Sequence, residues 1–205
     1  MAISTLAQLE NQVKSFMFRA NILDVVGADQ VDNLILLGEK WLLRRCRARE
    51  MESALSVVIS AGAATVPSDY RALKHARISG TPTRFLRQRK PQWIYENYPL
   101  RSADNKPFFI GVDGSTFVFG PYPDSNYTVD GYYYAAPTSV LTSANTLFTT
   151  HPDLYLFSAL AETESYIKND KRVAMWVAKR DSLVREINAE TEEGEQGQSM
   201  EVTIG

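Results

Sequence analysis

Hydrophobic side chains recur at three- and four-residue steps in the first part of the chain. Between Leu6 and Ala20 this spacing predicts an amphipathic helix, and Thr5 with Gln8 has the spacing of a capping box. The pattern stops before Gly27, where we expect this first helix to end.

A second helix is predicted to begin at Asp29, a favourable N-cap residue, and to end in an arginine-rich stretch. Several leucines lie off its main apolar stripe, so we expect the helix to be covered on more than one side. A helix shared between subunits has this pattern, and so has a central helix of a monomer. The residues predicted to contact a neighbouring subunit are Leu36, Leu37, Leu43, Arg44 and Arg47.

The hydrophobic pattern becomes β-like after residue 53. Short β-prone runs alternate with turn signals, and Asp113-Gly114 between two aromatic-rich runs is the clearest hairpin signal. A single helical turn carrying Trp93 and Tyr95 is expected between residues 91 and 98. We predict an antiparallel β subdomain over residues 54–136. Its expected strands cover residues 55–59, 76–78, 83–86, 108–112, 116–119 and 127–134.

Two further helices are predicted after residue 137. Thr150 and Asp153 bracket Pro152 with capping-box spacing, which places the helix start there. A break at Asn169-Asp170 separates the two helices, and such a short connection makes them antiparallel neighbours.

The end of the sequence is acidic and rich in glycine and glutamine from Thr191 onward. This composition is too polar to bury a core, so we predict a flexible tail. A β-prone segment closes it, formed by Glu201, Val202, Thr203 and Ile204. Such a tethered strand is suited to extending a sheet of another protein, and a frayed terminus is the alternative.

Together these patterns predict an α+β fold. Residues 1–53 and 137–190 are expected to form a helical bundle of about four helices. Residues 54–136 form the inserted antiparallel β subdomain, and residues 191–205 form the flexible tail. The length of 205 residues suits one core with an inserted subdomain.

Charge is unevenly distributed although the net charge is only -2. Residues 40–106 contain 14 Lys and Arg against 5 Asp and Glu, a balance of +9, so the remainder carries -11. Opposite charges in different parts of one chain favour head-to-tail self-association, or a basic patch that faces an acidic partner. A solvated basic surface is the simpler alternative.

The sequence also indicates where the protein folds. Cys46 is the single cysteine, so no disulfide forms within one chain and a reducing compartment fits. The start has no features of a signal peptide, and no apolar run approaches the ~18 residues of a membrane-spanning helix. We therefore expect folding in a cytoplasm and no membrane partner.

Residue patterns typical of catalysis are not found. His75, His151 and Cys46 lack the spacing of a zinc site, and we expect no metal and no cofactor. Glu162 and Glu164 are two apart on a helix and point in different directions, so they are not a natural acid pair for glycoside hydrolysis. The chain is predicted not to be an enzyme.

The chain resembles the adaptor (head-to-tail connector) proteins of tailed bacteriophages. The resemblance covers the order of helix, long helix, β insertion and helical hairpin, together with three motifs. These are a Pro-x-Asp-Tyr strand start, a Tyr-Tyr strand that runs into proline, and a His-Pro-Asp-Leu helix start followed by Ala-Glu. The residues that carry the motifs are Pro67, Asp69, Tyr70, Tyr132, Tyr133, Pro137, His151, Pro152, Asp153, Leu154, Ala161 and Glu162.

This resemblance implies a structural virion protein that completes the head. Such adaptors form a ring of about twelve copies under the portal, and the ring lines part of a DNA channel. The implied partners are the portal protein, tail or nozzle components, further copies of the chain, and genomic DNA that passes without sequence-specific contacts. The implied location is the virion neck, and the portal contact is assigned to residues 201–204.

Two other functions remain open from the residues alone. A virion-associated peptidoglycan-degrading enzyme would share the location. A nucleic-acid-binding protein would use the basic segment 40–106, in which Arg84, Arg87, Arg89 and Lys90 lie close to Trp93.

Overall fold

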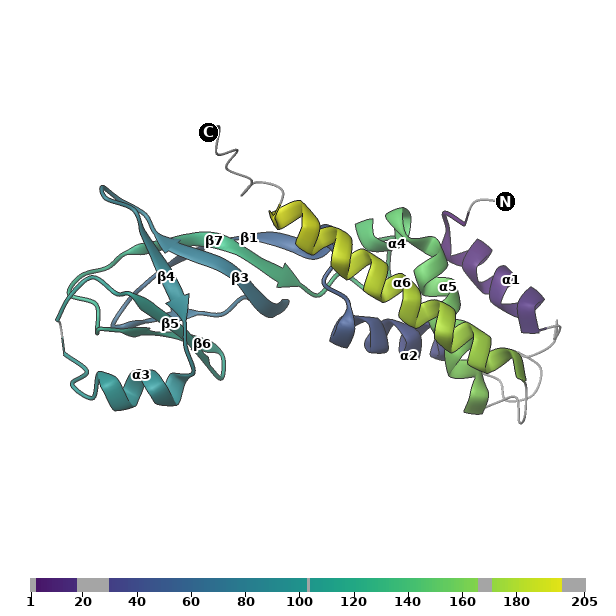
Figure 1. The fold of residues 1–205 in the computed structure, drawn as a ribbon, viewed down its shortest axis with the longest axis horizontal. Coiled ribbons are helices and arrows are strands. Elements are labelled where there is room, and N and C mark those ends of the chain that lie inside the picture. The colour runs from purple at the N-terminus through teal and green to yellow at the C-terminus, as the bar shows by residue number, and fades with distance from the viewer. Residues whose placement is uncertain (1–2, 18–29, 103, 166–170, 197–205) are drawn as a thin grey trace, which may run out of the picture. The chain divides into compact units, whose positions relative to one another are not determined.

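A computed structural model describes residues 3–17, 30–102, 104–165 and 171–196 (Figure 1). The chain divides into two compact units. The first, here called the helical unit, comprises Met1–Met51 and Pro137–Gly205. The second, the sheet unit, comprises Glu52–Ala136.

The helical unit is built around one short buried helix, α5. Seven of its residues between Leu154 and Ala161 are buried, and it contacts α1, α2, α4 and α6. The α-helices of this unit are α1 (Leu6–Met17), α2 (Gln30–Arg45), α4 (Thr146–Thr150), α5 (Pro152–Ala161) and α6 (Lys171–Gln196). Two 3-10 turns, η1 (Arg49–Met51) and η2 (Glu162–Ser165), complete it.

The predicted bundle of about four helices is not confirmed. The described residues contain six α-helices, five in the helical unit and one, α3, in the sheet unit. The short helix α4 was not predicted, because five residues are too few to show a period. Helix α6 continues to Gln196, so the segment from Thr191 to that residue is helical rather than flexible. The predicted helix start at Asp29 and the break at 169–170 lie outside the described residues.

Of the two predicted capping boxes, the one at Thr5 and Gln8 is present and the one at Thr150 is not. At α1 the Gln8 N–H donates to the Thr5 hydroxyl (3.3 Å), while the Gln8 side chain accepts from the backbone N–H of Ser4 (2.8 Å). The box at Thr150 is wrong, because Thr150 is the last residue of α4 and its hydroxyl donates to the Thr146 carbonyl. His151 precedes α5 without a side-chain cap, and Pro152 is its first residue.

Helices α2 and α5 cross with no side chain between their backbones at Gly38. A Cβ atom placed on Gly38 would lie 2.7 Å from the Ser158 carbonyl carbon and 2.9 Å from the Ala159 nitrogen. Backbone atoms cannot rotate away as a flexible side chain does, so any larger residue here forces the helices apart.

Polar side chains on α6 attach the other helices to it. Arg172 donates to the Phe16 carbonyl of α1 (3.1 Å). Asn188 accepts from the Arg47 N–H (2.7 Å) and donates to the Arg45 carbonyl (3.0 Å), so it satisfies backbone groups at the end of α2. No local pattern predicts this cap, because its two partners lie more than 140 positions from Asn188.

The sheet unit contains seven strands in the order β1-β7-β3-β4-β5-β6-β2, with all pairs antiparallel except β4 with β5. The predicted antiparallel subdomain is therefore corrected to a mixed sheet. The strands are β1 (Glu52–Val58), β2 (Ala63–Thr65), β3 (Tyr70–Ile78), β4 (Arg84–Gln88), β5 (Phe109–Asp113), β6 (Thr116–Gly120) and β7 (Thr128–Ala135).

The helix α3 (Pro91–Asn97) accounts for the parallel pair. Two parallel neighbours need a crossover connection, and the segment from β4 through α3 to β5 supplies one. Gly111 on β5 allows close packing there, because a Cβ atom on it would meet the Arg89 carbonyl oxygen at 2.8 Å. The helical turn at residues 91–98 was expected from the sequence, but its role as a crossover was not.

Strand β4 pairs with different neighbours along its length. Its first half pairs with β3, where Arg77 faces Phe85, and its second half pairs with β5, where Arg87 faces Phe109. The strands at the two ends of the order, β1 and β2, are joined by a tight turn with a Ser60–Ala63 bridge, so the ends of the sheet meet there. The core inside includes Ile78, Ile110, Phe117, Phe119 and Val129.

The hairpin predicted at Asp113-Gly114 is confirmed. Asp113 pairs with Thr116 across a two-residue loop, and Gly114 has a φ of 59°, a conformation that glycine adopts readily. Strand β2 and the first half of β3 were not predicted, because neither alternates cleanly between apolar and polar residues.

The crossing at Gly38 predicts the effect of one added methyl group. We expect Gly38→Ala to lower the free energy of unfolding by about 1–3 kcal/mol, despite the better helix propensity of alanine, because it overpacks against backbone. Gly194→Ala is the matched control, since a Cβ atom on Gly194 of α6 meets nothing within 4 Å. Urea unfolding of both variants measures the difference, and equal stability would show that the crossing can relax.

Candidate interaction surfaces

The predicted subunit-contact residues on α2 do not share one environment. Leu37 is 47% exposed and Arg44 is exposed, whereas Leu43 is 7% exposed and belongs to the core of the helical unit. Leu36 and Arg47 are half-buried, and the Arg47 guanidinium donates to the Cys46 carbonyl. Leu37 and Arg44 therefore offer most of the surface in this set.

Helix α6 carries an exposed hydrophobic residue that the sequence analysis missed. Met175 is 59% exposed, next to the buried Trp176. The only available signal was its position beside the apolar stripe of the helix. Among the described residues of the helical unit, Leu37 and Met175 are the large hydrophobic side chains most open to solvent.

Arg180 of α6 is a buried ion-pair residue of the helical unit. The Arg180 side chain is 8% exposed, and its guanidinium pairs with Glu162 (3.1 Å) and stacks over Trp41 of α2 (3.5 Å to the ring centroid). Glu162, considered above as a catalytic acid, is therefore an ion-pair partner. The side chain of Glu164 and the predicted portal segment 201–204 lie outside what the structure describes.

A surface of the sheet unit combines cations with exposed aromatic rings. We define the basic face as the outward side chains of β3, β4 and β7: His75, Arg77, Phe85, Arg87 and Tyr132. Phe85 is 66% exposed and Tyr132 is 46% exposed. Pairing places Phe85 opposite Arg77 and Tyr132 opposite His75, with the His75 and Tyr132 ring centroids 5.6 Å apart. Period-2 alternation on neighbouring strands thus gathers these residues on one side of the sheet.

Asp130 lies on the same side of the sheet as this face, opposite Arg77, and joins three strands. Its carboxylate accepts hydrogen bonds from the Ser79 and Ser56 hydroxyls, and Arg77 is its register partner on β3. The Ser79 bond, then the Ser56 bond and then the Arg77 charge lower the pKa of Asp130 below its ordinary value of 3.8. The carboxylate is therefore ionised at neutral pH and compensates part of the positive charge of the basic face.

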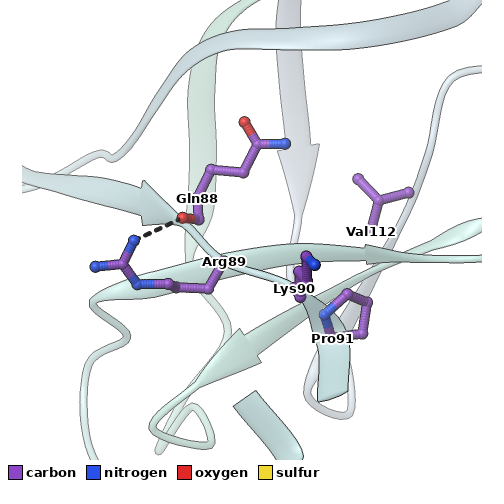
Figure 2. Close-up of a pocket in the computed structure, with 5 residues that line it drawn as sticks. All are labelled: Gln88, Arg89, Lys90, Pro91 and Val112. Carbon is purple, nitrogen blue, oxygen red and sulfur yellow. Dashed lines mark hydrogen bonds between the residues drawn. The ribbon is translucent and has the colours of Figure 1, made fainter. Parts of the chain in front are cut away.

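A shallow hollow of about 420 Å³ lies where β4 leads into α3. Figure 2 shows its lining residues, with the Arg89 guanidinium turned back toward the Gln88 carbonyl oxygen at 3.5 Å. The Arg89 guanidinium also lies over the rings of Trp93 (5.5 Å) and Phe109 (5.8 Å). Because it packs on rings of its own unit, this part of the predicted cation–aromatic cluster stabilises α3 against the sheet.

The titratable groups considered for chemistry occupy structural positions. His151 lies 3.7 Å from Glu50, and burial raises the pKa of the Cys46 thiol to about 11, so the thiol is protonated at neutral pH.

Within the described part of the chain, no three His, Cys, Asp or Glu side chains are grouped to hold a metal ion. Within the same residues, no helix is both long and apolar enough to span a bilayer.

The serine contacts of Asp130 predict a measurable titration. We expect Ser79→Ala to raise the pKa of Asp130 toward 3.8, because it removes the hydrogen bond that lowers it most. Because the pKa of Asp130 is lower in the folded state than in the unfolded state, its ionised carboxylate stabilises the folded protein. This contribution is fully present above the unfolded-state pKa and is lost as pH falls through the folded-state pKa. NMR titration of the carboxyl carbon measures this. Ser125→Ala, in the exposed loop before β7, should leave the pKa of Asp130 unchanged.

Comparison with known proteins supplies the family. No curated protein matches the chain. The model of the family described as SU10 adaptor protein matches residues 4–202, which include almost all of both units. The adaptor resemblance drawn from the sequence motifs is thereby confirmed: the chain belongs to the SU10 adaptor protein family, the structural adaptor proteins of bacteriophages.

Proposed function

We propose that this chain forms a ring of about twelve copies between the portal and the tail of a phage particle, and that the ring completes the head. Family membership over residues 4–202 is the observation that carries the proposal. It implies a non-enzymatic role in the virion neck and interaction with portal and tail components. The ring, its copy number and its place on the DNA path are the parts that we add.

The helical unit is proposed to form the wall of the ring. Leu37 on α2 and Met175 on α6 leave apolar area exposed in the single chain, and the neighbouring Arg44 is charged and exposed. Interface cores are enriched in methionine and arginine, and the exposed leucine adds apolar area that an interface can bury. A cyclic assembly would cover this area through the same contact repeated between successive copies.

The C-terminal segment is proposed to bind the portal. Residues 201–204 are β-prone and follow a glycine- and glutamine-rich stretch, so they can reach a sheet edge of a partner and extend it by backbone hydrogen bonds. Genomic DNA is proposed to pass through the ring by non-specific electrostatic contacts, since a conduit must not hold any sequence tightly.

Native mass spectrometry with the cognate portal ring tests the proposal. We expect the full chain to bind as one adaptor per portal subunit, because matched cyclic symmetry repeats one contact. Truncation after Met200 should weaken portal binding by roughly tenfold or more while it leaves all described helices in place. A full chain that stays monomeric beside the portal would contradict the proposed function. Unchanged binding after truncation would contradict only the portal contact.

A substitution on α2 tests the ring wall. We expect Leu37→Asp to weaken ring formation by roughly tenfold or more, because it places a charge in an apolar interface. The matched control is Leu100→Asp in the sheet unit, where the leucine is 79% exposed. Circular dichroism establishes that both variants fold, and native mass spectrometry counts the copies on the portal. Equal assembly of the two variants would remove Leu37 from the interface.

A further inference from the structure

Two strands of the basic face, β3 and β4, belong to a segment with cations but no acids, whereas the third strand, β7, carries Asp130 opposite Arg77. Residues 70–95 contain no Asp or Glu. They contain seven cations: Arg71, Lys74, Arg77, Arg84, Arg87, Arg89 and Lys90. Among the residues that the structure describes, Lys74 is the one member of this set that forms a salt bridge, with Glu52 at 2.6 Å. Most of this charge has no ion-pair partner in its own unit.

Exposed aromatic side chains make this face more than a solvated cationic surface. Phe85 lies between Arg77 across the strand pair and Arg87 two residues along β4, and it is 66% exposed. Leaving a phenylalanine ring in water forgoes a large part of its burial free energy. Aromatic and arginine side chains together are the composition enriched in protein interfaces.

The last turns of α6 carry the opposite charge. Glu186, Glu190 and Glu193 follow one another at four- and three-residue steps, so they share one side of the helix. These three residues and Glu192 are exposed, and none of the four forms an ion pair with a described cation. The chain has no Lys or Arg after Arg185.

This acidic end is unfavourable for an isolated helix. The C-terminal end of a helix dipole is negative, so carboxylates there are repelled. Glutamates spaced by three and four residues also repel one another. Cations from another surface would relieve both effects.

We propose that the basic face of one copy binds the acidic last turns of α6 of a second copy. The inference rests on the proposed ring and names two surfaces that would meet in it. Arg77 and Arg87 would pair with Glu190 and Glu193, while Phe85 would be covered by the bound helix. Because the two surfaces differ, the contact is heterologous, and its repetition produces either a closed ring or a filament.

Salt gives the first measurement of this contact. Exposed ion pairs are screened over about 8 Å at physiological ionic strength, so association should weaken steeply as salt is raised. Sedimentation velocity of the full chain over a concentration series measures this. A chain that remains monomeric at low salt and at its highest soluble concentration would overturn the inference.

Charge exchange identifies the surfaces. We expect the double variant Arg77→Glu with Arg87→Glu, and the double variant Glu190→Lys with Glu193→Lys, each to lose association by roughly tenfold or more. An equimolar mixture of the two variants should regain association, because each reversed surface then has an attractive partner. A chain with all four substitutions should regain it as well.

The control carries the same change in charge elsewhere. Arg49→Glu with Lys90→Glu reverses two exposed cations that belong neither to the basic face nor to the proposed ring wall, and should retain association. If this control weakens association as much as the basic-face variant, net charge is the cause and the inference fails. Failure of both the mixture and the four-substitution chain to recover would also overturn it.

Two other outcomes would replace the inference. If the basic-face variant self-associates normally but loses binding to a labelled duplex oligonucleotide, the occupant of the face is nucleic acid. If charge reversal changes the hydrodynamic radius without any dependence on concentration, the two charged surfaces pair within one chain. Portal binding by the basic-face variant is measured separately. If the self-association measurements contradict the inference but this variant still binds the portal fully, the proposed function stands and only the inference fails.

Discussion

The backbone contact between α2 and α5 at Gly38 determines how the helical unit is arranged. With no side chain between the two helices, α5 lies close enough to α2 to be buried along most of its length. Glu39, the next residue of α2, is also buried. Its buried carboxylate accepts from the Ser139 hydroxyl (2.6 Å) and the Val140 N–H (3.0 Å), which ties the chain returning from the sheet unit to α2. This pairing of a buried charge with two donors avoids the large cost of an unsatisfied carboxylate.

The position of α5 in turn orients the rest of the unit. Its Tyr155 hydroxyl is within hydrogen-bond distance of the Asn145 side chain, which also caps α4 by accepting from the Phe148 N–H. Burial raises the pKa of Tyr155, so it remains a neutral partner for this amide. On the other side, Arg180 and Asn188 fix α6 against Trp41 and the end of α2. The Asn145 contact thus joins α4 to α5, and the Arg180 and Asn188 contacts join α6 to α2.

Local sequence patterns predicted the features that local physics controls. The period of α1, the hairpin at Asp113-Gly114 and six of the strands are visible in short windows, because side-chain spacing and turn geometry are local properties. The parallel pairing of β4 with β5 was missed because strand direction depends on the whole crossover. The cap by Asn188 was missed because its partners at the end of α2 are far from it in the sequence. Leu37 and Leu43 both lie off the main apolar stripe of the predicted helix, and only packing shows that one is exposed and the other is core. The motifs around Pro67, Tyr132 and His151, by contrast, identified the family without any structural information.

Strand β4 contributes residues both to the core of the sheet unit and to its basic face. Leu86 faces the core while Phe85 and Arg87 face outward, and the strand is held on one half by β3 and on the other by β5. A strand has a side-chain period of two, so the loss of a single residue within β4 would exchange the two sides. The core would receive a guanidinium, and the outer surface would receive a leucine. Evolution can therefore change the chemistry of this surface by substitution, one side chain at a time, but insertions and deletions can be accommodated only in the turns at either end of the strand.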